Sequence, residues 1–194
     1  RVMSRLVYGV GINDGKYPTH INKKPLKQYK LWTGLLERCY SWDDKYKSYE
    51  NCEVSSNFKK YSYFYEWCLK QVGFGVDGFE IDKDILSVDS KIYSEKTCCF
   101  IPRSINVLLT NSKATRGDFP IGVSFDKRTF KFYAKIRIDG KQKHIGTFSN
   151  KDDAFNAYKI EKINEIKRQA LINRDLISNV VFDKLINYNI NIDS

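Results

Sequence analysis

The residue types that could support chemistry gather in the stretch 80–106. Asp82, Lys83 and Asp84 bring two carboxylates and an amine together, and Asn106 adds an amide further along the chain. Carboxylates and amines at such spacing can move protons or hold charged groups. The same residues are also typical of a plain polar strand end, so both interpretations stay open at this point.

The surrounding pattern predicts how these residues are positioned. Short apolar runs predict one strand ending near Asp82 and a second strand near Cys98–Ile101, with a loop between them. Pro102 favours the start of a helix, which Ser104 could cap. The predicted order is strand, loop, strand, helix.

Five cysteines could suggest a metal or disulfide framework: Cys39, Cys52, Cys68, Cys98 and Cys99. Their number is odd, their spacing is irregular, and no Cys-x-x-Cys pair exists. A zinc site of Cys39, Cys52 and Cys98 lacks the usual ligand spacing. We expect reduced, buried thiols that pack as small hydrophobes, which favours a cytosolic protein.

A second candidate surface lies further along the chain, where apolar and polar residues alternate strictly. Alternation at period two predicts a strand with one buried face. The predicted inner residues are Phe130, Phe132, Ala134, Ile136 and Ile138. The predicted outer residues are Lys131, Tyr133, Lys135 and Arg137. An outer face of cations and one aromatic suits the groove of DNA.

The neighbouring elements follow from local signals. Asp139-Gly140 predicts a tight turn that joins this strand to another at 142–148, and a third strand is expected at 121–125. Ser149 or Asn150 can cap a following helix. Its apolar side would cover the sheet with Ala154, Phe155, Ala157, Tyr158, Ile163 and Ile166.

These residues resemble the plant ethylene-response-factor, or Apetala-type, DNA-binding domain. The similarity rests on Gly122-Val123, Ala134–Arg137, Ile145–Phe148 and Ala154…Tyr158. It implies three antiparallel strands, one packed helix and a sheet that reads the major groove. The positions that the resemblance carries over are Ser124, Lys127, Lys135, Arg137, Gln142 and His144. We add Arg128, Lys131, Tyr133 and Lys143 from the same strands and turns, and Lys113 and Arg116 from the linker, where they could follow a phosphate backbone.

The first part of the chain resembles phage-encoded HNH-like proteins with a ββα-metal fold. The resemblance rests on Trp32 to Cys39, Asp82-Lys83, Tyr93-Ser94…Cys98 and Asn106, and on the order of the two modules. It implies a homing-type endonuclease that hydrolyses DNA phosphodiesters with a divalent metal, Mg²⁺ being the expected ion. The implied catalytic residues are Asp82 and Lys83, and the implied metal ligands are Asp82, Asp84 and Asn106. Lys83 stands where the family has its base histidine, and a lysine takes up a proton near neutral pH only if its pKa is strongly lowered.

Bulk properties agree with a nucleic-acid partner. The 194 residues carry 33 Lys and Arg against 23 Asp and Glu, a formal charge of +10, which favours a polyanion. With 42% hydrophobic residues the chain can bury a core. Neither a membrane-spanning run nor a signal peptide is evident.

Two amphipathic helices are predicted before residue 74, on Tyr29, Trp32, Leu35, Leu36 and Cys39, and on Tyr61, Phe64, Tyr65, Cys68, Leu69 and Val72.

The sequence therefore predicts an α+β protein with a ββα-metal-like module at 1–109, a linker at 110–118, a DNA-binding sheet and helix at 119–172, and a final helix and tail at 173–194. We expect a double-stranded DNA-binding protein that acts as an HNH-like endonuclease in the cytoplasm of a phage-infected bacterium. Two alternatives stay open: an inactive DNA-binding regulator or inhibitor of the same build, and a protein–protein adaptor.

Overall fold

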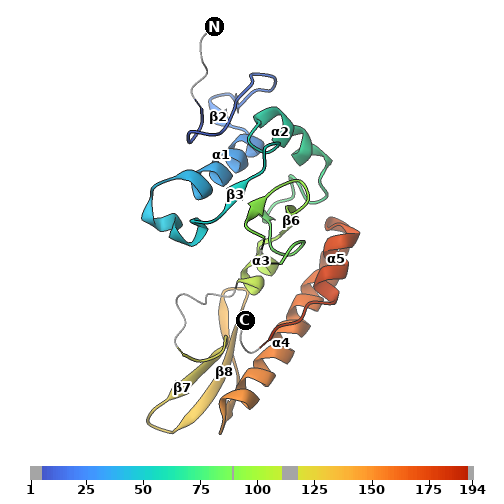
Figure 1. Ribbon diagram of the computed structural model, residues 1–194. Helices are drawn as coiled ribbons and strands as arrows, with labels where there is room; N and C mark the ends of the chain where they lie inside the picture. The colour runs from blue at the N-terminus through green and yellow to red at the C-terminus, as the bar shows by residue number, and fades with distance from the viewer. Residues whose placement is uncertain (1–5, 89, 111–117, 192–194) are drawn as a thin grey trace. The chain divides into compact units, whose positions relative to one another are not determined.

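The computed structural model describes residues 6–88, 90–110 and 118–191 and confirms the predicted α+β class. The chain forms two compact units, Arg1–Ile101 and Pro102–Ser194. This division places the helix after Pro102 with the second unit, whereas the sequence-based boundary at 109 placed it with the first. Figure 1 labels the elements.

The first unit combines two helices with short strands. Its elements are β1 (His20–Ile21), β2 (Lys24–Pro25), α1 (Lys27–Tyr40), the 3₁₀ helix η1 (Asp44–Tyr49), β3 (Glu53–Val54), α2 (Tyr61–Lys70), β4 (Phe79–Asp82), β5 (Ile92–Tyr93) and β6 (Cys99–Pro102). The strands pair two by two, as β1–β2, β3–β5 and β4–β6. The predicted strand–loop–strand order around Asp82 is thus present.

An aromatic cluster forms the core of the first unit. Trp32 of α1 is fully buried and its Nε1 donates to the carbonyl of Phe58 at 2.8 Å. The Phe58 ring packs on Phe64 and Trp67 of α2, with centroids 5.0 and 4.8 Å away. Tight aromatic packing of this kind supplies much of the stability of a small unit.

The second amphipathic helix is shorter than predicted. It ends at Lys70, so Val72 lies beyond it and is 50% exposed, while Leu69 lies within the helix on its solvent side and is 58% exposed. Trp67, three residues after Phe64, takes the inward position instead, because residues three and four apart share one helix face.

The second unit is a three-stranded sheet covered by a long helix (Figure 1). Its elements are α3 (Arg103–Leu109), β7 (Val123–Asp126), β8 (Lys131–Ile138), β9 (Lys141–Phe148), α4 (Lys151–Ile172), η2 (Arg174–Leu176) and α5 (Asn179–Ile186). The sheet order is β7–β8–β9 and both pairs are antiparallel. The predicted sheet and its helix are confirmed.

Local signals set the ends of these elements. Asp139 and Gly140 both have positive φ, 49° and 76°, as the tight turn between β8 and β9 requires. The Asn150 side chain accepts from the amide of Asp153 at 2.8 Å and caps α4. By contrast, α3 begins at Arg103 and has no side-chain cap, so the expected capping role of Ser104 is wrong.

The core of the sheet unit lies between β8 and α4. Ala134 and Ile136 are buried on the sheet, and Ala154, Phe155 and Tyr158 are buried on the helix. α3 and α5 also pack on α4. One predicted core residue is misplaced: Phe130 is 75% exposed, because it lies in the turn before β8 with a φ of 53°.

Candidate nucleic-acid interface

The face of the sheet away from α4, here called the open face, carries most of the predicted DNA-binding residues. Directly paired residues point to the same side of a sheet. Tyr133 pairs with Ser124 on one side and Thr147 on the other, opposite in direction to the buried Ala134. The next rows are Lys135 with His144 and Arg137 with Gln142. β7, β8 and β9 therefore bring residues from 124 to 147 onto one surface.

A β-bulge decides which residues of β9 reach this surface. Ala134 pairs with Gly146, but Lys135 pairs with His144, so Ile145 is the extra residue. Pairing from the Asp139-Gly140 turn places Gln142 and His144 opposite Arg137 and Lys135 on the open face, and the bulge reverses the side of the residues that follow Ile145. Thr147, which the sequence did not single out, joins them; only knowledge of the bulge could have identified it.

Lys143 lies between Gln142 and His144 and therefore faces away from the open face. Lys143 pairs with Ile136, whose side chain is buried toward α4. Its Nζ forms an ion pair with Glu161 of α4. The structure therefore places Lys143 on the helix side of the sheet, in contrast to its predicted role.

The centre of the open face is an aromatic ring flanked by basic groups. The rings of Tyr133 and His144 lie 5.7 Å apart, and the Lys135 Nζ lies 5.6 Å from the centroid of Tyr133. Together with Gln142 these residues line a shallow open hollow. His144 is oriented by Thr147, whose Oγ1 lies 3.3 Å from its Nε2.

One acid shapes the edge of the face. Asp126 accepts from the amide of Arg128 at 2.8 Å and from the Thr129 hydroxyl at 3.0 Å, and these bonds lower the pKa of its carboxyl. The Tyr133 hydroxyl donates to the same carboxylate at 3.3 Å. Asp126 thus fixes the β7–β8 turn and the Tyr133 ring.

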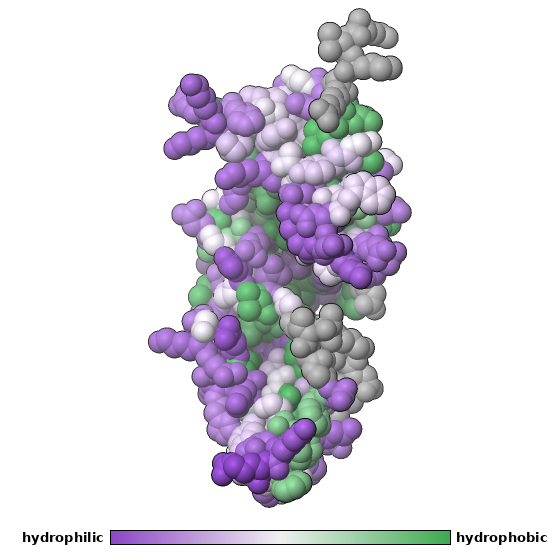
Figure 2. Space-filling view, turned by 90° about the vertical axis from the view of Figure 1, so that its left-hand side faces the viewer, coloured by the Kyte–Doolittle hydropathy of each residue, from purple (hydrophilic) through white to green (hydrophobic). Residues whose placement is uncertain are grey.

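The remaining predicted cations surround this centre. Lys127 and Arg128 are exposed in the β7–β8 turn, and the Lys131 Nζ donates to the Ser149 hydroxyl at 3.0 Å. Figure 2 shows one side of the molecule, on which hydrophilic side chains are interspersed with hydrophobic ones. Lys113 and Arg116 lie outside the described residues.

In the first unit, Asp82 is buried at the end of β4 and organises the following loop. Its Oδ2 accepts from the amides of Asp84 and Ile85, both at 2.9 Å. Burial raises the pKa of the Asp82 carboxyl, with a further contribution from Asp84, although the two amide bonds and Lys83 act in the opposite direction. This geometry gives Asp82 a structural role in turning the chain.

Lys83 is held as a cation. Its Nζ forms an ion pair with Asp84 and donates to the carbonyl of Ser90 at 2.9 Å. Burial alone would lower the pKa of Lys83, but the interaction with Asp84 outweighs it and the pKa lies above its usual range. A lysine in this state cannot accept a proton from water near neutral pH.

The predicted metal ligands do not form a set within one unit. One carboxylate oxygen of Asp82 accepts hydrogen bonds from backbone amides, and Asp84 forms an ion pair with Lys83. Asn106 belongs to α3 in the second unit. No group of three or more His, Cys, Asp or Glu among the described residues could hold a metal ion. The carboxylate and amide oxygens of the predicted ligands are of the type that Mg²⁺ binds, and the metal site stays a prediction.

The cysteines are free thiols. Four are buried and Cys39 is half-buried. Burial raises the pKa of Cys39 and of Cys98 to about 12. Protonated, buried thiols agree with the expected packing role.

Comparison with known proteins assigns no family to this chain. No family model, no curated protein and no solved structure matches the chain. No helix in the part of the chain that the structure describes is long and apolar enough to cross a membrane.

Proposed function

We propose that this protein binds double-stranded DNA through the open face of the β7–β8–β9 sheet. The observation that carries the proposal is the grouping of Lys131, Lys135 and Arg137 on one exposed side of β8, with Asp126 as the nearby acid of β7. A face of this kind attracts a polyanion, and the chain's formal charge of +10 acts in the same direction.

The shape of the surface favours the major groove. The groove, about 12 Å wide, admits a two-stranded β-ribbon, and β8 and β9 form such a ribbon. Arg137 and Gln142 pair across it, and these side-chain types make bidentate contacts with guanine and adenine. The lysines of β8 suit phosphate contacts, which fix position rather than sequence.

The paired state of Lys83 argues against DNA cleavage. The family that the first unit resembles needs a base beside the metal, and Lys83 is a paired cation in that position. We therefore propose that the protein lacks the catalytic proton acceptor of this family. It binds DNA without cleaving it and acts as a regulator. Nicking of a plasmid in the presence of Mg²⁺, Mn²⁺ or Co²⁺, lost in Asp82→Ala, would instead establish the endonuclease.

Charge reversal on the open face tests the proposal. Lys135→Glu/Arg137→Glu should abolish duplex binding, since a bidentate arginine contact alone is worth about 1–3 kcal/mol. Both side chains lie on the solvent side of the sheet, so stability should change by no more than about 0.5 kcal/mol. Binding is measured by fluorescence anisotropy with a mixed-sequence duplex.

Lys159→Glu/Lys184→Glu is the matched control. These lysines lie on α4 and α5 and the double change alters the net charge equally. Binding should survive in this variant. Equal loss in both variants would mean that only overall charge matters, and unchanged binding in the open-face variant would remove the sheet from the interface. Binding to an acidic protein without binding to duplex DNA would favour an adaptor.

A further inference from the structure

Arg38, near the end of α1, lies beside two tyrosine rings of the first unit. Its Cζ is 5.9 Å from the ring centroid of Tyr49 in η1 and 5.6 Å from that of Tyr93 in β5. Tyr93 is buried, whereas Arg38 and Tyr49 are half-buried. Aromatic faces attract cations at such distances, so the two rings hold the guanidinium in a defined place.

The guanidinium of Arg38 keeps most of its hydrogen-bonding capacity for a ligand. Its Nε donates to the carbonyl of Gly34, one helical turn earlier, at 3.1 Å. The two terminal nitrogens donate to no group among the residues that the structure describes. Within the same residues, no buried side-chain nitrogen or oxygen is without a hydrogen-bond partner. The terminal nitrogens therefore reach the solvent, where they present four of the five N–H groups of the side chain.

The charge of Arg38 is not balanced by an ion pair with any described residue. Lys83, whose Nζ lies 5.7 Å from the same Tyr93 ring, is by contrast paired with Asp84. Burial raises the pKa of Tyr93, and the positive charge of Arg38 acts against this rise. Partial burial of a charge without a counter-charge costs free energy, so an anion from outside would stabilise this place.

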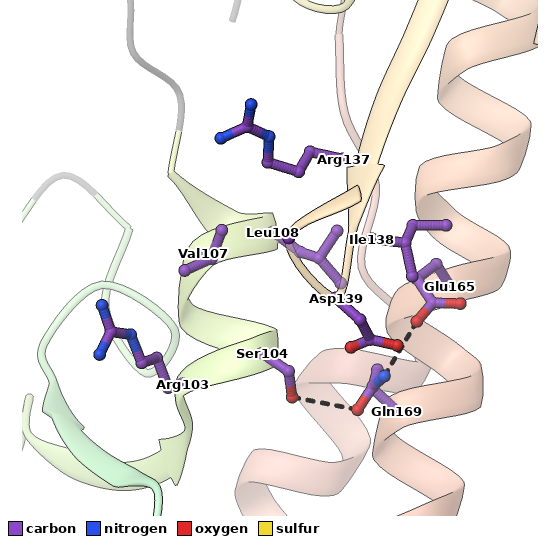
Figure 3. A pocket seen from close by; sticks show the side chains of 10 residues that line it. Arg103, Ser104, Val107, Leu108, Arg137, Ile138, Asp139, Glu165 and Gln169 are labelled. Carbon is purple, nitrogen blue, oxygen red and sulfur yellow. Dashed lines mark hydrogen bonds between the residues drawn. The ribbon is translucent and has the colours of Figure 1, made fainter. Parts of the chain in front are cut away.

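The hollow beside α3 in the second unit differs in this respect, because its polar groups bind one another. Figure 3 shows that the Ser104 hydroxyl donates to Oε1 of Gln169 at 3.1 Å, and that the Gln169 Nε2 donates to Oε1 of Glu165 at 2.9 Å. The Glu165 carboxylate also accepts two bonds from Arg168, of 2.6 and 2.7 Å. These groups serve to join α3 to α4, whereas the terminal nitrogens of Arg38 serve no such contact.

We propose that Arg38 binds a phosphate of the DNA backbone through the terminal nitrogens of its guanidinium. The planar fork of an arginine matches the oxygens of a phosphate with two parallel hydrogen bonds, and the tyrosine rings hold that fork ready. Such a contact adds affinity without sequence preference. This inference rests on the proposed DNA-binding function and extends it from the sheet to the first unit.

The salt dependence of duplex binding by the full chain tests the assignment. Each phosphate contact adds about 0.9 to the steepness with which log affinity falls against log salt. Arg38→Gln should reduce this steepness by about 0.9 and weaken binding to every duplex sequence alike. Arg38→Lys should recover the steepness but only part of the affinity, because the charge returns without the fork. Lys24→Gln on β2 removes the same charge from an exposed position of the first unit and should match wild type.

Hydrogen exchange of the wild-type protein gives a second readout, which is needed because Arg38→Gln also removes two ring contacts and could unfold the unit. Added duplex should slow exchange in η1 and at the end of α1 as well as in β8 and β9. Protection of the sheet alone, or an Arg38→Gln salt dependence equal to that of wild type, would overturn the role of Arg38 while leaving DNA binding by the sheet intact.

Inorganic phosphate distinguishes the two sources of this anion. If phosphate alone stabilises wild type but not Arg38→Gln, and the salt dependence of duplex binding is the same in both, the site takes free phosphate and the DNA contact is refuted. Absence of salt-dependent duplex binding by wild type would instead refute the proposed function, and this inference with it.

Discussion

The backbone of Gly122 lies directly against the ring of Tyr158. A Cβ placed on Gly122 would stand 2.1 Å from Cδ2 of that ring, far inside contact distance, and the φ of Gly122 is +77°. The Gly122 carbonyl also accepts from the amide of Lys135 at 2.9 Å. One glycine thus lets the start of β7 approach α4 and supports the strand that carries the open face.

Gly122→Ala should therefore destabilise the sheet unit strongly. Overpacking costs about 1–3 kcal/mol, and a non-glycine residue at positive φ adds about 1 kcal/mol or more. Urea denaturation followed by circular dichroism measures the loss. Gly140→Ala is the matched control: its φ is +76°, but nothing lies within 4 Å of its Cβ, so only the backbone strain should appear. Equal effects would mean that the ring of Tyr158 moves aside easily.

Asp82 predicts a pH-dependent stability. Its pKa in the folded protein lies above the ordinary 3.8 because the carboxyl is buried. At pH values between the pKa of the unfolded chain and the raised pKa of the folded protein, the folded state binds more protons than the unfolded state. The free energy of unfolding therefore falls as pH rises through that window. Asp82→Asn keeps an oxygen for the amides of Asp84 and Ile85 and removes the charge.

The Asp82→Asn variant should accordingly gain stability relative to wild type as pH rises through this window. Urea midpoints across the acidic range, measured for both proteins, test it. If the urea midpoints of wild type and Asp82→Asn differ by the same amount at every pH, the pKa of the Asp82 carboxyl is not raised by burial. Asp82→Ala should be less stable than Asp82→Asn, since it leaves two amides without their acceptor, at about 1–3 kcal/mol if they stay buried.

Much of the sheet unit was predictable because its signals are local. The Asp139-Gly140 turn depends on residues that tolerate positive φ, and the Asn150 cap depends on an amide three residues ahead. The buried positions of β8 follow from alternation alone. Such features need no knowledge of distant contacts.

The rest of the site depends on pairing between strands, which alternation cannot reveal. Ile145 is an ordinary strand residue in the sequence, yet as a bulge it reverses the direction of every residue after it in β9. Phe130 similarly fits the alternating pattern but lies in a turn at positive φ. In the first unit, sequence places Lys83 beside Asp82 and Asp84 but does not show that Asp84 keeps it protonated.

The register of the β8–β9 hairpin yields a prediction for two adjacent residues. Gln142 pairs with Arg137 on the open face, whereas Lys143 pairs with Ile136 and forms an ion pair with Glu161 on the helix side. Gln142→Ala should lower affinity and relax the preference at one base pair, since a bidentate contact discriminates by about 1–3 kcal/mol. Lys143→Ala should leave binding and preference unchanged, despite losing a positive charge. Competition binding against duplexes that differ at single base pairs measures both effects. A large effect of Lys143→Ala together with none from Gln142→Ala would show that β9 pairs with β8 one residue out of the register that the Asp139-Gly140 turn sets.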